Sequence, residues 1–429
     1  MSFSYSATNT FLKTHFRDLF DVTLKDASPF LSAMKKKKAS AGGRTVNHTI
    51  LYSNAGVVSA QLSSTITGYA ASAGSVEAQL PWCRQYAYGE IDDLQLSLMK
   101  KSKDSYIEGV AKLQSQLIAG INQRLGAMAF SKGLGVLGET AAAGTYTAGS
   151  TSIVLKDKSM INNFAVGMYL TFTSDETGGT SAATTYITAI DKSAGGFTVA
   201  SGTGIANDDY IWAPGDSPAA ALAAVGDNKW APGLQCWFPL PTAASTRSLV
   251  TGDAYLVGCT RTADTVGLAG AYYYGASDTS IEECLNSALH RGSRLGGNYN
   301  FIVMNPEQRG VFVSQLGSKV QYGFLPARGI DGPIADVGFD TVRIHGPDNV
   351  IDVVSDRFCP VNGMWAGNWE DIHLLSVNEN LPELFDEDGN IILRKADSVN
   401  HSMMAKAYYT VAVDRPINFM SIVPPTLSL

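Results

Sequence analysis

The sequence predicts an α+β protein with an extended N-terminal part, one long helix, an all-β segment and a mixed body of helices and strands. Three observations predict this class. Apolar residues recur at three- and four-residue spacing over residues 103–129, as in an amphipathic helix. Residues 139–216 are rich in Thr, Gly, Ala and Ser, with short β-like runs between turn residues. The apolar run Phe301–Met304 reads as a buried strand that leads straight into a new helix.

The bulk composition indicates a large globular chain with much hidden surface. Its 429 residues are too many for one ordinary core and suit two or three lobes. Hydrophobic residues make up 45%, which excludes a disordered chain. Charged residues make up only 17%, as expected where subunits cover one another. The net charge of −7 argues against a generally basic nucleic-acid coat, so any DNA contact must be local.

Targeting and redox signals are absent from the sequence. The first residues lack a basic segment followed by an apolar core, so no signal peptide is predicted. No apolar run reaches the roughly 18 residues of a membrane span. The five cysteines are widely spread and include no C-x-x-C, which predicts reduced core residues. They are Cys83, Cys236, Cys259, Cys284 and Cys359.

Residues 1–43 are predicted to form an N-terminal arm. A short amphipathic helix is expected around residues 10–21, with Phe11, Phe16 and Phe20 available to one side. The lysine run 35–38 and the small residues after it read as a charged, hinge-like stretch. Deleting residues 1–40 is therefore expected to leave a folded subunit that assembles poorly.

Residues 44–92 are predicted to form an extended β loop. It opens with a strand at residues 45–52 and returns at residues 85–91. An isolated two-stranded hairpin is marginally stable in water, so this loop should lie on another surface. The helix 103–129 follows within an expected domain 93–138. At about 1.5 Å per residue it would be roughly 40 Å long, the length of a strut.

The remainder is predicted as a β module and a mixed body. Residues 139–216 should form an all-β barrel or sandwich. A helix is expected over residues 280–291, with Thr279 and Glu282 spaced for a capping box. For the helix after Phe301–Met304, Asn305 is a suitable N-cap, Pro306 suits the first helical position and Gln308 completes a capping box.

No motif predicts catalysis, a cofactor or a metal. Gly133–Gly138 fits G-x-G-x-x-G but follows a helix and opens none, so the dinucleotide reading fails. Asp386–Asn390 resembles a calcium loop without its later glutamate and is better explained as a hairpin turn. The six histidines are scattered without metal-ligand spacing. We therefore expect a protein that is not an enzyme.

Three sequence motifs in the C-terminal half, together with the order of the predicted segments, resemble those of a known family. The motifs are Phe301–Gln308 after the predicted helix 280–291, the stretch from Asp356-Arg357-Phe358-Cys359-Pro360 to Asp371–Leu374, and the C-terminal stretch Ala407–Pro416. The chain resembles the major capsid protein of tailed double-stranded-DNA bacteriophages, with the shell fold named after phage Hong Kong 97. The resemblance implies an N-terminal arm 1–43, an extended loop 44–92, a peripheral domain with spine helix 93–138, an inserted β domain 139–216, an axial domain 217–355, return strands of the peripheral domain 356–413, and an axial C-terminal segment 414–429.

The resemblance also implies function and partners. The chain would self-assemble as hexamers and pentamers into an icosahedral capsid around packaged double-stranded DNA, which it touches without reading sequence. Portal, separate scaffolding and decoration proteins are the other implied partners, with no membrane. The location would be the virion capsid, assembled in the host cytoplasm. No lysine lies between Lys38 and Lys100, so this loop is not expected to form an isopeptide cross-link.

Candidate contact residues follow from charge and aromaticity. Seven lysines could meet DNA phosphate or a neighbour's carboxylates, with a plainly solvated arm as the alternative. They are Lys35, Lys36, Lys37, Lys38, Lys100, Lys101 and Lys103. Five aromatic residues are candidate interface anchors. They are Phe11, Phe16, Phe20, Tyr86 and Tyr88.

Two other functions stay open at the level of sequence. One is an encapsulin-like nanocompartment shell of the same fold, which holds enzyme cargo in place of DNA. The other is a structural protein whose β module binds glycans or adheres to a surface. A glycan array with the module would distinguish the second from a capsid.

Overall fold

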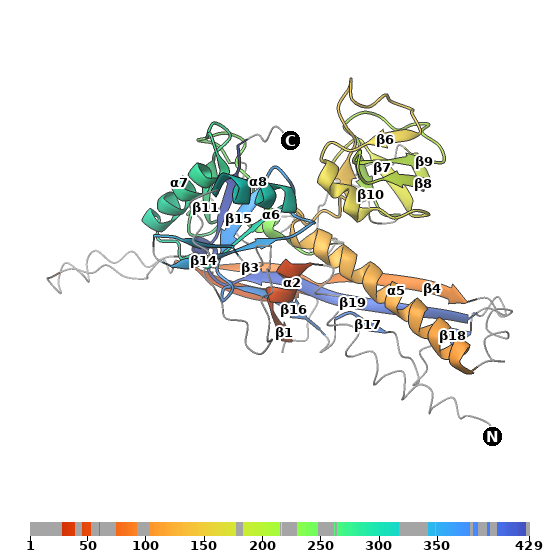
Figure 1. Ribbon diagram of the computed structural model, residues 1–429. Helices are drawn as coiled ribbons and strands as arrows, with labels where there is room; N and C mark the ends of the chain where they lie inside the picture. The colour runs from red at the N-terminus through yellow and green to blue at the C-terminus, as the bar shows by residue number, and fades with distance from the viewer. Residues whose placement is uncertain are drawn as a thin grey trace, which may run out of the picture.

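We describe the fold from a computed structural model of the chain. The structure describes residues 28–38, 45–52, 60, 74–91, 103–176, 183–214, 216, 230–247, 261, 264–316, 342–347, 349–377, 381–384, 393–394 and 401–425. These residues form three six-stranded sheets and one two-stranded ribbon. The predicted mixture of helices and strands is confirmed (Figure 1).

The first sheet is an elongated limb built around one long strand, β19 (His401–Val413). On one side β19 pairs with β4 (Cys83–Ile91), and on the other with β16 (Ile372–Ser376). β1 (Lys35–Lys38) then pairs in parallel with β16 and ends the sheet. Two short strands, β17 (Glu383–Leu384) and β18 (Leu393–Arg394), extend the β16 side along β19.

The predicted long helix is confirmed as α5 (Lys103–Ala129), which runs along the limb (Figure 1). Leu117, Ile121 and Leu125 are buried at helical spacing, which places its apolar stripe on the sheet. The Tyr409 hydroxyl contacts Met128 Sδ, so odd-numbered residues of β19 face the helix. Even-numbered residues such as Tyr408 therefore lie on the opposite face.

The second sheet forms a separate α/β body. Its strand order is β11-β20-β15-β12-β14-β13. The central strand β12 (Phe301–Met304) is buried throughout, as its apolar run predicts. Helices α7 (Ile281–Arg294) and α8 (Pro306–Leu316) belong to this body, and α7 packs on β11 and β20. The other strands are β11 (Ala271–Tyr274), β13 (Val342–His345), β14 (Val350–Ser355), β15 (Met364–Gly367) and β20 (Met420–Val423).

The third sheet forms a β unit of order β5-β10-β7-β8-β9-β6. Its core includes Ile153, Phe172 and Ile211, which point to one face of the sheet. Its strands are β5 (Gly138–Glu139), β6 (Ser152–Val154), β7 (Tyr169–Thr173), β8 (Ala183–Asp191), β9 (Gly196–Val199) and β10 (Tyr210–Trp212). A 3₁₀ helix, η1 (Lys158–Asn163), joins β6 to β7, and the unit lies beside one end of α5 (Figure 1).

The extended loop pairs differently from the expectation. β2 (Thr45–Leu51) pairs antiparallel with β3 (Ser75–Pro81), not with residues 85–91. The reason is burial: Ala78 and Leu80 of β3 are fully buried, as is Ile50 of β2. β4 pairs instead with β19 in the limb sheet. The segment 44–92 therefore contributes both a ribbon and a full sheet strand.

Helix starts test the capping predictions. The capping box at α8 is confirmed, because Asn305 Oδ1 accepts from Glu307 N at 3.0 Å and Asn305 N donates to Gln308 Oε1 at 3.1 Å. The box predicted at Thr279 and Glu282 is wrong by one residue. Ser280 is the N-cap of α7 and accepts from Glu283 N at 3.1 Å. The helix begins at Ile281, which is buried in the core together with Leu285, so the residue before its first turn is Ser280.

The expected return segment 356–413 divides between two sheets. β15 pairs with β12 and β20 in the α/β body, so the crossing to the limb comes only after residue 367. Trp365 and Ala366 are fully buried there, which fixes this placement. Two short helices, α6 (Leu234–Trp237) and η3 (Pro416–Asn418), complete the described elements outside the arm. No helix in the described ranges has the length and apolarity needed to cross a membrane.

Candidate assembly surface

The end of the expected arm is part of the core. Residues Pro29–Ala33 form a short helix, α2, with Ser28 as N-cap. Phe30 is fully buried. Its ring centroid lies 5.3 Å from that of Phe130, the residue after α5, and 5.9 Å from that of Phe301 in β12. This burial argues against the prediction that a subunit without residues 1–40 would still fold. The reason is that this segment fills the junction between α5 and the α/β body.

A buried carboxylate fixes this segment. Asp356 Oδ2 accepts from Ser28 Oγ at 2.5 Å and from Phe30 N at 3.2 Å. Burial raises the pKa of Asp356, against the opposing effect of its hydrogen bonds with Ser28, Phe358 and Phe30. The sequence analysis missed this site. The available signal was Ser28-Pro29, an N-cap followed by a proline at the first helical position.

The lysine run forms an edge strand rather than a hinge. Lys35 to Lys38 make up β1, and all four side chains are exposed. Their partners along β16 run from His373 to Ser376. Because successive side chains alternate across a strand, Lys36 and Lys38 point to the α5 face and Lys35 and Lys37 to the opposite face. The charge is thus divided between two surfaces.

Most of the other predicted contact residues fall outside the described part. Lys100 and Lys101 do so, and so do Phe11, Phe16 and Phe20. Lys103 is the first residue of α5. The structure therefore brings together only β1 and the two tyrosines of β4 as parts of one sheet.

The predicted tyrosine anchors lie on the limb face opposite α5. Tyr86 is 62% exposed and Tyr88 is 52% exposed. The Tyr86 hydroxyl lies 3.2 Å from that of Tyr408, and the two rings meet edge to face at 6.1 Å. The hydrogen bond with Tyr86, together with burial, raises the pKa of Tyr408 to about 12. We call Tyr86, Tyr88 and Tyr408 the tyrosine face. It is an aromatic surface of the kind that anchors protein interfaces, and charged side chains border it, with Lys406 over the Tyr408 ring and Glu90 bonded to the Tyr88 hydroxyl.

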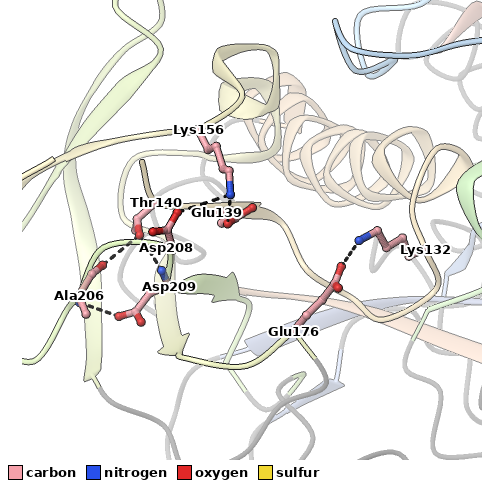
Figure 2. A network of polar contacts seen from close by, with 8 residues as sticks. All are labelled: Lys132, Glu139, Thr140, Lys156, Glu176, Ala206, Asp208 and Asp209. Carbon is pink, nitrogen blue, oxygen red and sulfur yellow. Dashed lines mark hydrogen bonds and ion pairs between the residues drawn. The ribbon is translucent and has the colours of Figure 1, made fainter. Parts of the chain in front are cut away.

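Polar contacts tie the β unit together and fix it to the end of α5 (Figure 2). Lys132, just beyond α5, pairs with Glu176 after β7. Gln123 of α5 donates to the carbonyl of Asn162 in η1. Inside the unit, Lys156 Nζ lies 2.5 Å from Glu139 Oε1 and 3.5 Å from Asp208 Oδ1.

A second set of bonds closes the loop before β10. Thr140 Oγ1 donates to the carbonyl of Ala206 at 3.0 Å and accepts from Asp209 N at 2.8 Å. Asp209 Oδ2 accepts from Ala206 N at 2.6 Å. Each group in Figure 2 therefore has a partner within the protein. This network is a structural one and offers no free acid, base or nucleophile.

The described residues also lack the elements of a catalytic or metal site. No group of three or more His, Cys, Asp or Glu residues among them could hold a metal ion. The four described cysteines are free thiols and buried. Burial raises the pKa of Cys236 to about 12, which keeps this thiol protonated and unreactive. An open hollow of about 770 Å³ lies between Gln123, the residues after η1 and the end of β8. Its lining residues do not form a set of catalytic groups.

Comparison with known proteins assigns the fold. No family model matches the sequence, and no curated protein matches it. A chain of the cyanophage A-1(L) capsid asymmetric unit matches with TM-score 0.51 and 11% identity, covering 93% of both chains. A chain from Microbacterium phage Oxtober96 matches with TM-score 0.40 and 12% identity, covering 93% of this chain and 91% of that one. A capsid chain of the native GTA particle matches with TM-score 0.40 and 10% identity, covering 92% and 90%.

The cyanophage match carries the assignment, since it spans nearly the full length of both chains at a TM-score above 0.5. At 11% identity the likeness is one of fold. This chain has the fold of a phage capsid protein.

Proposed function

We propose that this chain is the major capsid protein of a tailed bacteriophage and that it self-assembles into the icosahedral shell around double-stranded DNA. The observation that carries the proposal is the fold shared with the cyanophage A-1(L) capsid chain over 93% of both chains. The low content of charged residues, 17%, is in keeping with a surface largely covered by neighbours.

The Hong Kong 97-type parts map onto the elements as follows. The arm, residues 1–43, is anchored by α2 and β1. The extended loop, residues 44–92, contains β2, β3 and β4. Helix α5 is the spine helix. The limb sheet is the peripheral domain, and the α/β body is the axial domain. The β unit, between α5 and the α/β body in sequence, is an insertion domain.

The contact surfaces take roles from their chemistry. The tyrosine face anchors a neighbouring copy, because exposed tyrosines bury large area at low entropic cost. The lysines of β1 meet DNA phosphate or a neighbour's carboxylates through charge alone. Portal, scaffolding and decoration proteins would be further partners, and the particle would assemble in the host cytoplasm.

The test is assembly of the chain expressed alone and with neighbouring genes of its operon. We expect megadalton particles of uniform curvature by light scattering after size exclusion and by electron microscopy. Co-purified DNA would support a virus, and enzyme cargo would indicate a nanocompartment instead. A chain that stays monomeric under both conditions would contradict the proposal.

A further inference from the structure

Arg247 and Arg291 contact the same tyrosine ring at the edge of the α/β body, and Arg261 lies near Arg247. The edge strand β11 carries Tyr272, a half-buried residue. The guanidinium carbon of Arg247 lies 4.9 Å from the Tyr272 ring centroid, and that of Arg291 lies 5.2 Å from it. One tyrosine ring therefore holds two guanidinium groups by cation–π contact.

Arg247 and Arg261 stabilise the fold through hydrogen bonds to backbone carbonyls. Arg247 donates to the carbonyls of Ala269, Gly270 and Thr265 at 2.7–3.0 Å. Arg261 is buried and donates to the carbonyls of Cys236 and Trp237, each at 2.9 Å. Burial, with a contribution from Arg261, lowers the pKa of Arg247 to about 10. Arg247 therefore still carries charge at neutral pH, and carbonyl oxygens do not cancel it.

Arg291 has a different environment. It lies in the last turn of α7, where the helix dipole favours a cation. Its guanidinium rests on Tyr272 and makes neither an ion pair nor a hydrogen bond with any residue that the structure describes. The helix dipole accounts for one cation here. It does not account for a second arginine on the tyrosine ring that Arg247 already contacts, because like charges repel.

We propose that Arg291, positioned by Tyr272 and reinforced by the charge of Arg247, binds a carboxylate of a second copy of this chain; this inference rests on the proposed function. A guanidinium in contact with an aromatic ring can still form two parallel N–H bonds to one carboxylate. The chain has 39 acidic and 32 basic residues, so a neighbouring copy offers carboxylates in excess. The site lies on an edge strand, where a neighbour can approach.

The test compares two neutralised arginines at opposite edges of one sheet. Arg291→Gln removes the proposed contact. Arg343→Gln is the matched control, since Arg343 is exposed on the other edge strand β13 and already pairs with Asp352 at 2.9 Å. We expect Arg291→Gln to raise the critical concentration for assembly about tenfold, with the thermal midpoint of the subunit unchanged. Arg343→Gln should leave both unchanged.

A second measurement identifies the bound group. In particles of Arg291→Lys, assembled from mixed ¹⁵N-labelled and unlabelled subunits, a carbodiimide should join Lys Nζ at position 291 to an Asp or Glu of another copy as an amide. Mass spectrometry of mixed-label peptides would reveal that link. If the wild-type chain forms particles and Arg291→Gln assembles equally well, the inference is overturned while the proposed function stands. Cross-links found only within one copy would have the same consequence.

Two further outcomes would also decide the matter. If Arg291→Gln particles assemble normally but lose DNA, the site binds phosphate and the carboxylate assignment is overturned. If the wild-type chain forms no particles at all, the proposed function fails and this inference fails with it.

Discussion

Ser28 and Asp356 are joined by a buried hydrogen bond of 2.5 Å although 328 positions separate them in the chain. Both residues are fully buried. The bond connects the start of α2 to the turn after β14, and so connects the arm to the α/β body. Ser28, Phe30, Leu31 and Met34 are therefore part of the core.

Removing this hydroxyl should destabilise the subunit. Ser28→Ala leaves a buried carboxylate short of a donor, and the expected cost is about 1–3 kcal/mol in the free energy of unfolding. Urea denaturation would measure it. The matched control is Ser32→Ala in the same helix, because the exposed Ser32 hydroxyl only donates to the carbonyl of Pro29. Equal costs for the two variants would contradict the special role of Ser28.

The same site should give the subunit a pH dependence. Burial raises the pKa of Asp356 above its ordinary 3.8, so the folded state binds this proton more tightly than the unfolded chain. The contribution of Asp356 to stability therefore falls as pH rises from 3.8 through the folded-state pKa. Ser28 opposes this by favouring the charged form. We expect the cost of Ser28→Ala to be larger at about pH 7 than at about pH 4, and a pH-independent cost would contradict this.

Two truncations should separate the arm from the core. Removing residues 1–27 leaves α2 and β1 in place, so the fold should persist. Removing residues 1–38 also removes Phe30, Leu31 and Met34 from the core, and loss of one such phenylalanine alone typically costs about 3–5 kcal/mol. Thermal unfolding and solubility would compare the two proteins. Equal stability would show that the packing of α2 contributes nothing.

Local signals predicted α5, α7 and α8 and the strands β2, β4 and β12, but not the short helices α2 and α6. The apolar spacing of residues 103–129 gave α5 within its observed bounds, and the pair Asn305 and Gln308 gave the start of α8. These features depend on neighbours a few positions away. The predicted cap at Thr279 failed because Ser280 is an equally good cap one residue later, and only tertiary burial of Ile281 decides between them.

The missed features depend on distant parts of the chain. The lysine run 35–38 has no apolar alternation, so nothing local predicts a strand; its ladder partner is β16, more than 300 positions later. Charged edge strands are nevertheless common, because lysines discourage further pairing. The division of residues 356–413 between two sheets likewise depends on which sheet buries Trp365. The local signal Ser28-Pro29 indicates the start of a helix, but it does not identify Asp356, 328 positions away, as the partner.

The cap of α8 provides a stability test within the α/β body. Asn305→Ala removes the bond to Glu307 N and the 2.7 Å bond from Asn305 Nδ2 to the carbonyl of Cys359. We expect a cost of about 1–3 kcal/mol in the free energy of unfolding. Asn305→Asp should recover the capping part but not the donor to Cys359, giving an intermediate cost. An alanine variant as stable as wild type would contradict the cap.

Particles of this chain should not be covalently cross-linked through the extended loop. No lysine lies between Lys38 and Lys100, so the segment that contains β2, β3 and β4 has no amine for an isopeptide bond. After boiling in SDS, particles should run as a single monomer band. A ladder of covalent oligomers would contradict this prediction, and mass spectrometry of the ladder would locate the link.

The strand geometry of β1 predicts that its four lysines act as two pairs. Lys36 and Lys38 share the face of α5, whereas Lys35 and Lys37 share the face of Tyr408. In a closed shell one face of this sheet lies nearer the packaged DNA, and phosphate contacts depend on proximity because salt screens charge over about 8 Å. The double variants Lys35→Gln/Lys37→Gln and Lys36→Gln/Lys38→Gln carry equal charge changes and control for each other. We expect only one of them to reduce nuclease-protected DNA per particle, and equal losses would show that the run acts as an undivided basic patch.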